Sequence, residues 1–254
     1  MSLPITLQKQ IDEALYAIQE HPKSDLDPFH RLVIYQFFAS LSGLKGRIAR
    51  IHLSVMAAHR VLHLYDVLPE EHGYPTMPRL MISTAEQLLS HLSEGLTEQQ
   101  PNELATGIMI EVGYGPEAQP IEVHTHTAMG LARLAQEMND LTGEMPTSLY
   151  YHAWCAFLAA KSALEEALGW DVFQNAVIDA STSNSDLKWI GDTAKWAAIA
   201  YAGGEWTEFE EQDPSDFSPQ GNWNYSSTIV RSKRKEFWEW WCSEVIPTAW
   251  RYSA

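Results

Sequence analysis

The chain has 254 residues, 45% of them hydrophobic, which is enough to bury a substantial core. Its 33 Asp and Glu residues against 17 Lys and Arg give a formal net charge of −16. Such a charge disfavours binding to nucleic acid and to anionic membranes, and it attracts basic proteins. The two cysteines, Cys155 and Cys242, are too few for a disulfide framework. With no leader-like start and no apolar run of about twenty residues, we expect a cytoplasmic protein.

Helical periodicity dominates the sequence. Apolar residues recur every three or four positions and period-two alternation is scarce, so we expect an all-α protein. In chain order, helices are predicted near residues 4–20, 28–41, 45–68, 78–95, 101–111, 121–142, 147–169, 185–203 and 228–246. We expect a compact bundle of about eight or nine helices in a single domain over residues 1–254. A weak division near 115–120 is the alternative.

Individual residues mark several of these boundaries. Asp27 and Pro28 provide a capping side chain and a first helical residue typical of a helix start. Gly95 and Gly203 follow periodic apolar segments and are typical of helix ends.

The helix predicted at 45–68 carries titratable side chains on one face. With about 100° of rotation per residue, four of them fall within a stripe about 60° wide. They are His52, His59, His63 and Asp66. Apolar residues flank the stripe on both sides, and Arg50 and Ser54 occupy the arc assigned to solvent. We therefore predict that the stripe points inward as a polar network, because an unpaired buried polar group costs about 1–3 kcal/mol. Partial exposure of these side chains is an alternative.

A more specific alternative is that the polar residues of this helix form a metal site. His59 and His63 are one turn apart, and a nearby pair of histidines on another helix could add ligands. The candidate ligands for a divalent transition metal are His59, His63, Asp66, His124 and His126. This hypothesis describes a helical metal-dependent hydrolase, although no glutamate follows His59 to serve as a general base.

Other catalytic patterns are missing from the sequence. It contains no GxSxG, GxxxxGK, GxGxxG or CxxC motif. Cys155 follows His152 by three residues, a spacing that could activate a thiolate, but a small buried core residue is the commoner role.

Aromatic and acidic residues concentrate in the C-terminal half, where all ten tryptophans follow residue 153. Residues 204–227, which we call the acidic segment, are too many for a simple turn and predict a packed surface loop or a partner-binding loop. In the last helix the predicted inner face is Phe237, Trp238, Trp241 and Val245. Arg234 projects onto the same face, where it could stack on Trp238 or Phe237.

The sequence resembles the fifth immunity-protein family of bacterial polymorphic toxin systems in three phrases: VMAAHRVLHLYDVLPEEHGYPTMPRLMISTAEQLL, TAKWAAIAYAGG and RSKRKEFWEWWCSEVIPTAW. Members of that family carry an early helix ending in a VLpLy phrase, a proline-spaced second helix, alanine-rich helices and a final FWxWxxxxxiPxAw segment. Residues 96–145 carry no matching phrase, and His63 stands where a proline is expected. The histidine stripe is therefore no family feature.

The resemblance implies an all-α protein that neutralises a cognate toxin by binding it, with no chemistry of its own. A charge of −16 suits capture of a basic effector such as a nuclease, whose cationic active site acidic groups would occupy. From charge and aromatic placement, we predict a partner-binding set of acidic residues with aromatic anchors. Its members are Glu205, Trp206, Glu208, Glu210, Glu211, Asp213, Asp216, Trp223 and Trp240. A helical scaffold or homo-oligomer is the third hypothesis.

Overall fold

The computed structural model describes residues 2–65, 77–95, 147–168, 193–203 and 229–253. Within these ranges the chain is helical and contains no β-strand, which confirms the predicted all-α class. No helix in the same ranges combines the length and the apolar character needed to cross a bilayer. The helices predicted at 101–111 and 121–142, and the division near 115–120, lie outside the described residues.

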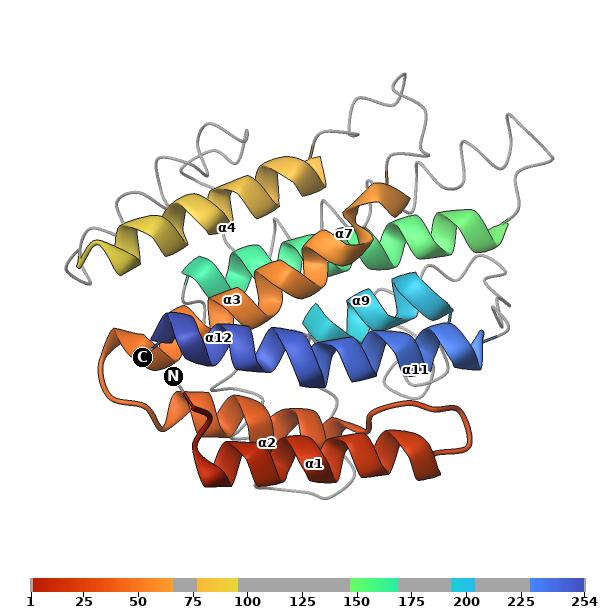
Figure 1. Ribbon diagram of the computed structural model, residues 1–254. Coiled ribbons are helices and arrows are strands. Elements are labelled where there is room, and N and C mark those ends of the chain that lie inside the picture. Colours follow the sequence, from red (N-terminus) through yellow and green to blue (C-terminus); the bar gives the residue numbers. More distant parts are fainter. Residues whose placement is uncertain (1, 66–76, 96–146, 169–192, 204–228, 254) are drawn as a thin grey trace, which may run out of the picture.

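The described helices lie at predicted positions, although the helix predicted at 185–203 is described only from Thr193 and the α-helix predicted at 45–68 ends at Val61 (Figure 1). They are α1 (Ile5–Glu20), α2 (Pro28–Ala39), α3 (Leu44–Val61), α4 (Met77–Ser93), α7 (Thr147–Leu168), α9 (Thr193–Ala202), α11 (Arg231–Trp240) and α12 (Ile246–Ser253). A short 3₁₀ turn at Leu62–Leu64 extends α3, and a π-helical turn at Trp241–Val245 joins α11 to α12.

Capping and backbone geometry explain several boundaries. The Asp27 carboxylate accepts a hydrogen bond from the His30 N–H at 3.1 Å, and Pro28 occupies the first helical position of α2. Gly95 and Gly203 have φ values of +82° and +76°, a region that glycine enters without steric cost, and they end α4 and α9.

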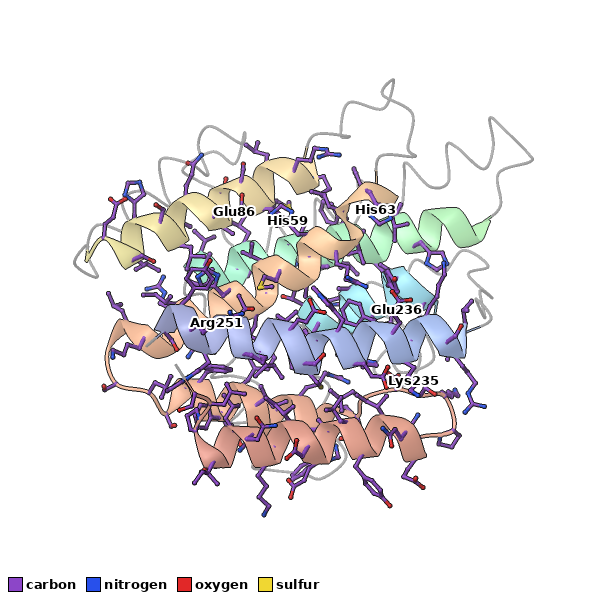
Figure 2. The ribbon with its side chains drawn as sticks, in the orientation of Figure 1. His59, His63, Glu86, Lys235, Glu236 and Arg251 are labelled. Carbon is purple, nitrogen blue, oxygen red and sulfur yellow. The ribbon has the colours of Figure 1, made fainter. Side chains whose placement is uncertain are left out.

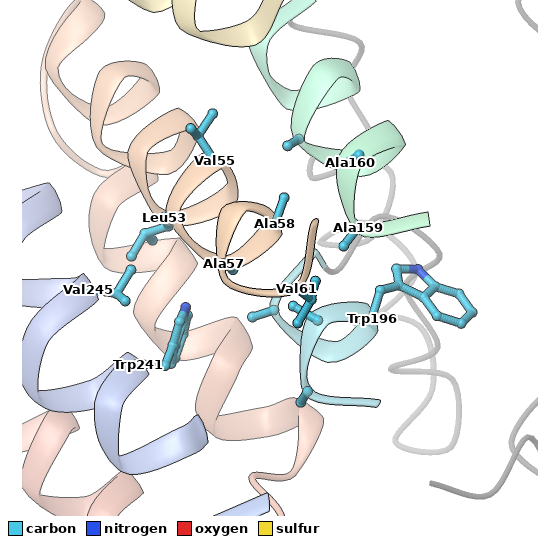
Figure 3. Packing of buried hydrophobic residues seen from close by; sticks show 14 of the residues in the cluster. Leu53, Val55, Ala57, Ala58, Val61, Ala159, Ala160, Trp196, Trp241 and Val245 are labelled. Carbon is cyan, nitrogen blue, oxygen red and sulfur yellow. The ribbon is translucent and has the colours of Figure 1, made fainter. Parts of the chain in front are cut away.

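One hydrophobic core joins the described helices. The helix α7 packs against α3, α4 and α9, while α3 also contacts α12. The faces of α7 and α9 in this core are rich in alanine, which permits close approach of the helix axes. Figure 3 shows Val61 of α3 near Ala159 of α7, in the region where α3, α7 and α9 pack together.

The C-terminal helix is longer than predicted. Its expected end was residue 246, but the helical path continues through Pro247 to Ser253 (Figure 1). Proline lacks an N–H and its ring crowds the preceding turn of an α-helix. Here the N–H of Ile246 donates to the Trp241 carbonyl, five residues back. This wider π turn loosens the hydrogen-bond ladder where proline cannot contribute, so the helix can continue.

The inner face predicted for this helix is confirmed. Phe237, Trp238, Trp241 and Val245 are all fully buried. The rings of Trp238 and Trp241 lie 5.8 Å apart at 85°, an edge-to-face arrangement that aromatic pairs favour. These clustered C-terminal aromatic residues therefore form part of the hydrophobic core.

Candidate functional site

The acidic segment lies outside the described residues, together with every predicted partner-binding residue except Trp240. The residues on either side of it are described. The Val230 N–H donates to the Ala202 carbonyl oxygen at 2.9 Å, which holds the start of α11 against the end of α9. The described residues on the two sides of the acidic segment therefore lie close together.

A buried arginine reinforces this junction. Arg234, in the first turn of α11, is only 3% exposed. One terminal nitrogen donates to Asp25 Oδ2 at 3.0 Å, and the other donates to the Gly203 carbonyl oxygen. The position of Arg234 on the inner face was predicted, but the guanidinium that lies over Trp238 is that of Arg31, at 5.4 Å from the ring centroid.

Asp25 is the carboxylate at the centre of this network. Its Oδ1 accepts the indole N–H of Trp238 at 2.6 Å, while Oδ2 accepts from Arg234. Burial acts to raise the pKa of Asp25, but attraction to Arg234 and Arg31, with the hydrogen bonds from Trp238 and Arg234, outweighs burial and lowers the pKa. Asp25 is therefore ionised at neutral pH, and it joins the α1–α2 turn to α11.

Two members of the histidine stripe, His59 of α3 and His63 of the 3₁₀ turn after it, face outward, which contradicts the predicted inward orientation. His59 and His63 are exposed, and His52 is half-buried. Asp66 lies outside the described residues. Ser54, which was assigned to solvent, is only 2% exposed.

The neighbours of α3 explain why this prediction was wrong. Helices α2, α4, α7, α9 and α12 all pack against α3, so little of its surface is left for solvent. Buried Gly46 and Ala57 permit close packing on the arc assigned to water. Arg50 lies on that arc, but its Nε donates to Glu166 Oε1 of α7 at 2.8 Å. A hydropathy pattern does not distinguish an arginine that is paired across a helix interface from an arginine that faces solvent.

The partner of His59 is Glu86 of α4. Nε2 of His59 lies 2.7 Å from Glu86 Oε1, and both side chains are about half exposed (Figure 2). In the part of the chain that the structure describes, no three His, Cys, Asp or Glu side chains gather as metal ligands. Since Asp66, His124 and His126 fall elsewhere, the metal site stays a prediction.

Trp240, the described member of the partner-binding set, contacts Arg60. The Arg60 guanidinium carbon lies 4.3 Å from the centroid of Trp240 and 5.0 Å from that of Tyr201. Arg60 and the Tyr201 hydroxyl both donate to Glu236 Oε1, at 3.1 and 2.5 Å. The hydrogen bond to Glu236, together with burial, raises the pKa of Tyr201. Trp240 thus has a cationic neighbour from its own chain, and its role in partner binding stays a prediction.

Both cysteines are buried free thiols, as predicted. Burial and, to a smaller extent, the charge of Glu239 raise the pKa of Cys242 to about 12, so this thiol is protonated at neutral pH. The Nδ1 atom of His152 lies 2.6 Å from the Ala200 carbonyl oxygen and donates to it. That bond joins α7 to α9 and gives His152 a structural role.

Charge is divided unevenly along the chain. The described residues include 12 of the 33 Asp and Glu and 15 of the 17 Lys and Arg, so their formal charge is +3. The other residues hold 21 acidic and 2 basic side chains, a formal charge of −19. The acidic segment contributes six carboxylates and no Lys or Arg.

No protein-family model matches the chain, and comparison with curated proteins gives no match. The resemblance to the fifth immunity-protein family accordingly stays a prediction that rests on the three phrases of the sequence.

Sequence reasoning missed Asp25, Arg31 and Glu86. Asp25 and Arg234 are 209 positions apart, and no local pattern connects them. Arg31 did offer a signal, because it occupies the inner face of α2 beside Leu32 and Ile34. A cation at such a position indicates a buried acceptor elsewhere in the chain.

Proposed function

We propose that this protein is an immunity-type inhibitor that binds and neutralises a basic protein toxin, such as a nuclease, without chemistry of its own. The observation that carries the proposal is the acidic segment, whose six carboxylates have no basic residue among them. The described residues that flank this segment lie close together, joined by the Val230–Ala202 hydrogen bond. The segment concentrates negative charge in one stretch of the sequence.

Electrostatics supply the mechanism. Clustered carboxylates speed encounter with a cationic surface, and they compete with anionic substrate for a basic active site. Trp206 and Trp223 would add buried aromatic anchors, the residue type that contributes most to binding energy at interfaces. The described residues have a formal charge of +3 and would not attract a basic partner. The attraction would come from the remaining residues, whose formal charge is −19.

The proposal extends to architecture and location. It describes one compact all-α domain over residues 1–254, with about eight or nine helices, in the bacterial cytoplasm. A homo-oligomer is the alternative assembly, and light scattering separates it from a monomeric inhibitor.

Co-expression tests the function. Bacteria that carry a basic toxin domain from the same genome should grow when this chain is also expressed. The triple variant Glu208→Lys, Glu210→Lys, Glu211→Lys should associate more slowly with that toxin, show weaker salt dependence and protect less, while its helicity is unchanged.

A matched variant controls for total charge. Replacing Glu20, Glu94 and Glu244 with Lys makes the same change in net charge at exposed positions on the described helices. Full protection by this variant, with loss of protection by the first, places the contact in the acidic segment. Equal protection by both variants would remove that segment from the interface.

A further inference from the structure

Four side chains form a cluster where α3, α9 and α11 meet. Tyr201 and Trp240 contribute aromatic rings and Glu236 contributes a carboxylate, and we call these three groups the aromatic cage. Arg60 of α3 occupies it, with its guanidinium carbon 4.3 Å from the Trp240 ring and 5.0 Å from the Tyr201 ring. Its Nη2 donates to Glu236 Oε1 at 3.1 Å. Aromatic faces combined with a carboxylate are the groups with which proteins bind a cationic side chain.

The aromatic cage has supports other than Arg60. The Tyr201 hydroxyl donates to Glu236 Oε1 at 2.5 Å, which joins α9 to α11. Both rings also pack on Phe237, which is fully buried, at centroid distances of 5.9 Å for Tyr201 and 5.6 Å for Trp240. The cage should therefore keep its shape when Arg60 leaves, and a preformed site binds without the cost of ordering its groups.

Arg60 fits the aromatic cage incompletely. A guanidinium has five N–H donors, but only Nη2 of Arg60 donates to the cage, and Nε is buried with no acceptor among the described residues. That unpaired donor regains a hydrogen bond when the side chain swings into water. The side chains of Arg60 and Glu236 are 27% and 56% exposed, and ion pairs so accessible to water are weak. Arg60 can therefore leave the cage at little cost.

The carboxylate of the cage also has unused capacity. In the described structure Glu236 accepts hydrogen bonds only at Oε1, from Arg60 and Tyr201. An arginine that approaches from solvent can orient itself to reach both carboxylate oxygens, the bidentate geometry that gives the strongest pairing. Arg60 is tethered to α3, and it reaches only one of them.

We propose that the aromatic cage binds an arginine side chain of a basic protein partner, and that Arg60 occupies the cage while the partner is absent. Trp240 then serves the partner as the face on which its guanidinium stacks. Tryptophan and tyrosine are residue types that contribute most to binding energy at interfaces. The identity of this partner as the toxin rests on the proposed function, whereas the affinity of the cage for an arginine side chain does not.

Titration with N-acetyl-arginine methylamide at constant ionic strength tests the cage in the protein alone. The signal is the NMR resonance of the Trp240 indole N–H, which is assigned by its loss in Trp240→Phe. We expect Arg60→Ala to bind this probe at least about tenfold more tightly than the wild type, because the competing cation is gone. Arg60→Gln also removes the cation, and its side-chain stem keeps the packing on α3, so this variant gives the result if Arg60→Ala does not fold.

Two further variants are the controls. Arg251→Ala removes the same charge from α12, away from the cage (Figure 2), and should bind the probe as weakly as the wild type. Adding Glu236→Gln to the Arg60 variant should abolish the gain. Absence of a gain in a folded Arg60 variant would overturn the proposal. An equal gain in Arg251→Ala would also overturn it, since the effect would then be one of net charge.

Binding to the toxin that the wild type neutralises supplies the functional result. Trp240→Leu should bind it at least about tenfold more weakly, whereas Arg60→Gln should bind as tightly as the wild type or more tightly. Weaker binding by Arg60→Gln would place Arg60 in the interface and overturn its role as the resident cation. If the wild type binds no basic toxin, the proposed function fails, and the titration still decides whether the cage binds arginine.

Discussion

The imidazole of His52 stacks on the phenol ring of Tyr252, with centroids 4.2 Å apart and 16° between the planes. The contact joins α3 to α12, and it places the imidazole where water is partly excluded. This burial lowers the pKa of His52 from 6.5 to about 4. The neutral ring is therefore the form that the folded protein prefers.

The first prediction concerns pH. Between pH 6.5 and about 4, the unfolded chain protonates His52 while the folded chain does not, so the free energy of unfolding should fall as pH falls through this window. Allowing for partial exposure, we expect His52 to contribute about 1 kcal/mol of that loss by pH 5. His52→Phe keeps the stacked ring and removes the titration. Urea unfolding at pH 7 and pH 5 should show a smaller difference for the variant, and an equal difference would contradict the account.

The second prediction compares two tryptophans. Trp238 and Trp241 are both fully buried, but only the indole N–H of Trp238 has a hydrogen-bond acceptor among the described residues. Replacement by Phe removes similar volume from each site. Trp238→Phe should therefore lower the free energy of unfolding by about 1–2 kcal/mol more than Trp241→Phe. Denaturant titration measures both values, and equal losses would mean that the bond to Asp25 contributes little.

The third prediction concerns the crossing of α2 and α3. A Cβ atom at Gly46 would lie 2.1 Å from the Phe38 carbonyl oxygen, which belongs to the backbone and cannot rotate away. Gly46→Ala should cost about 3 kcal/mol or more. Gly43 is the matched site, because it has a φ of +64° but no atom within 4 Å of an added Cβ. Gly43→Ala should cost less, about 1–3 kcal/mol, because its strain comes from the backbone conformation alone (φ +64°, ψ −145°), and thermal unfolding ranks the two.

The fourth prediction concerns metal. His59 pairs with Glu86, and His63 is exposed, so these two histidines do not converge on a shared centre in the described structure. We expect the natively purified protein to contain no stoichiometric transition metal by elemental analysis. About one ion per chain, lost in His59→Ala, would instead support the site that includes Asp66, His124 and His126 and would favour the metalloenzyme hypothesis.

Periodicity was sufficient to predict the described helices and the inner face of the last one. Phe237, Trp238 and Trp241 are large apolar residues at helical spacing, and a pattern of that kind leaves few alternatives. The same reasoning failed on α3. Its neighbours cover nearly all sides, and its small residues and paired arginines carry little hydrophobic signal. Locating the buried face from a hydropathy pattern requires a broad solvent-exposed face on the other side of the helix. The solvent-exposed face of α3 is narrow.

The Asp25 network could not have been predicted for a different reason. Its members come from a turn, a helix end and a helix start that are adjacent only after folding. A local pattern reports which face of a helix is buried, but it does not report which carboxylate meets which guanidinium. By contrast, the acidic segment was visible in the sequence because charge composition needs no knowledge of contacts.

The π turn at Trp241–Val245 also sets the rotational phase of everything after it. A π turn contains one residue more than an α-helix needs for the same path, so closing this turn into an α-helix with every residue kept would turn Ile246–Ser253 by about 100° around the helix axis. Ala249 would leave the core, and the Trp250 indole would swing away from the Ser2 carbonyl that it meets at 3.1 Å. The π geometry of this turn thus keeps the two ends of the described chain in contact.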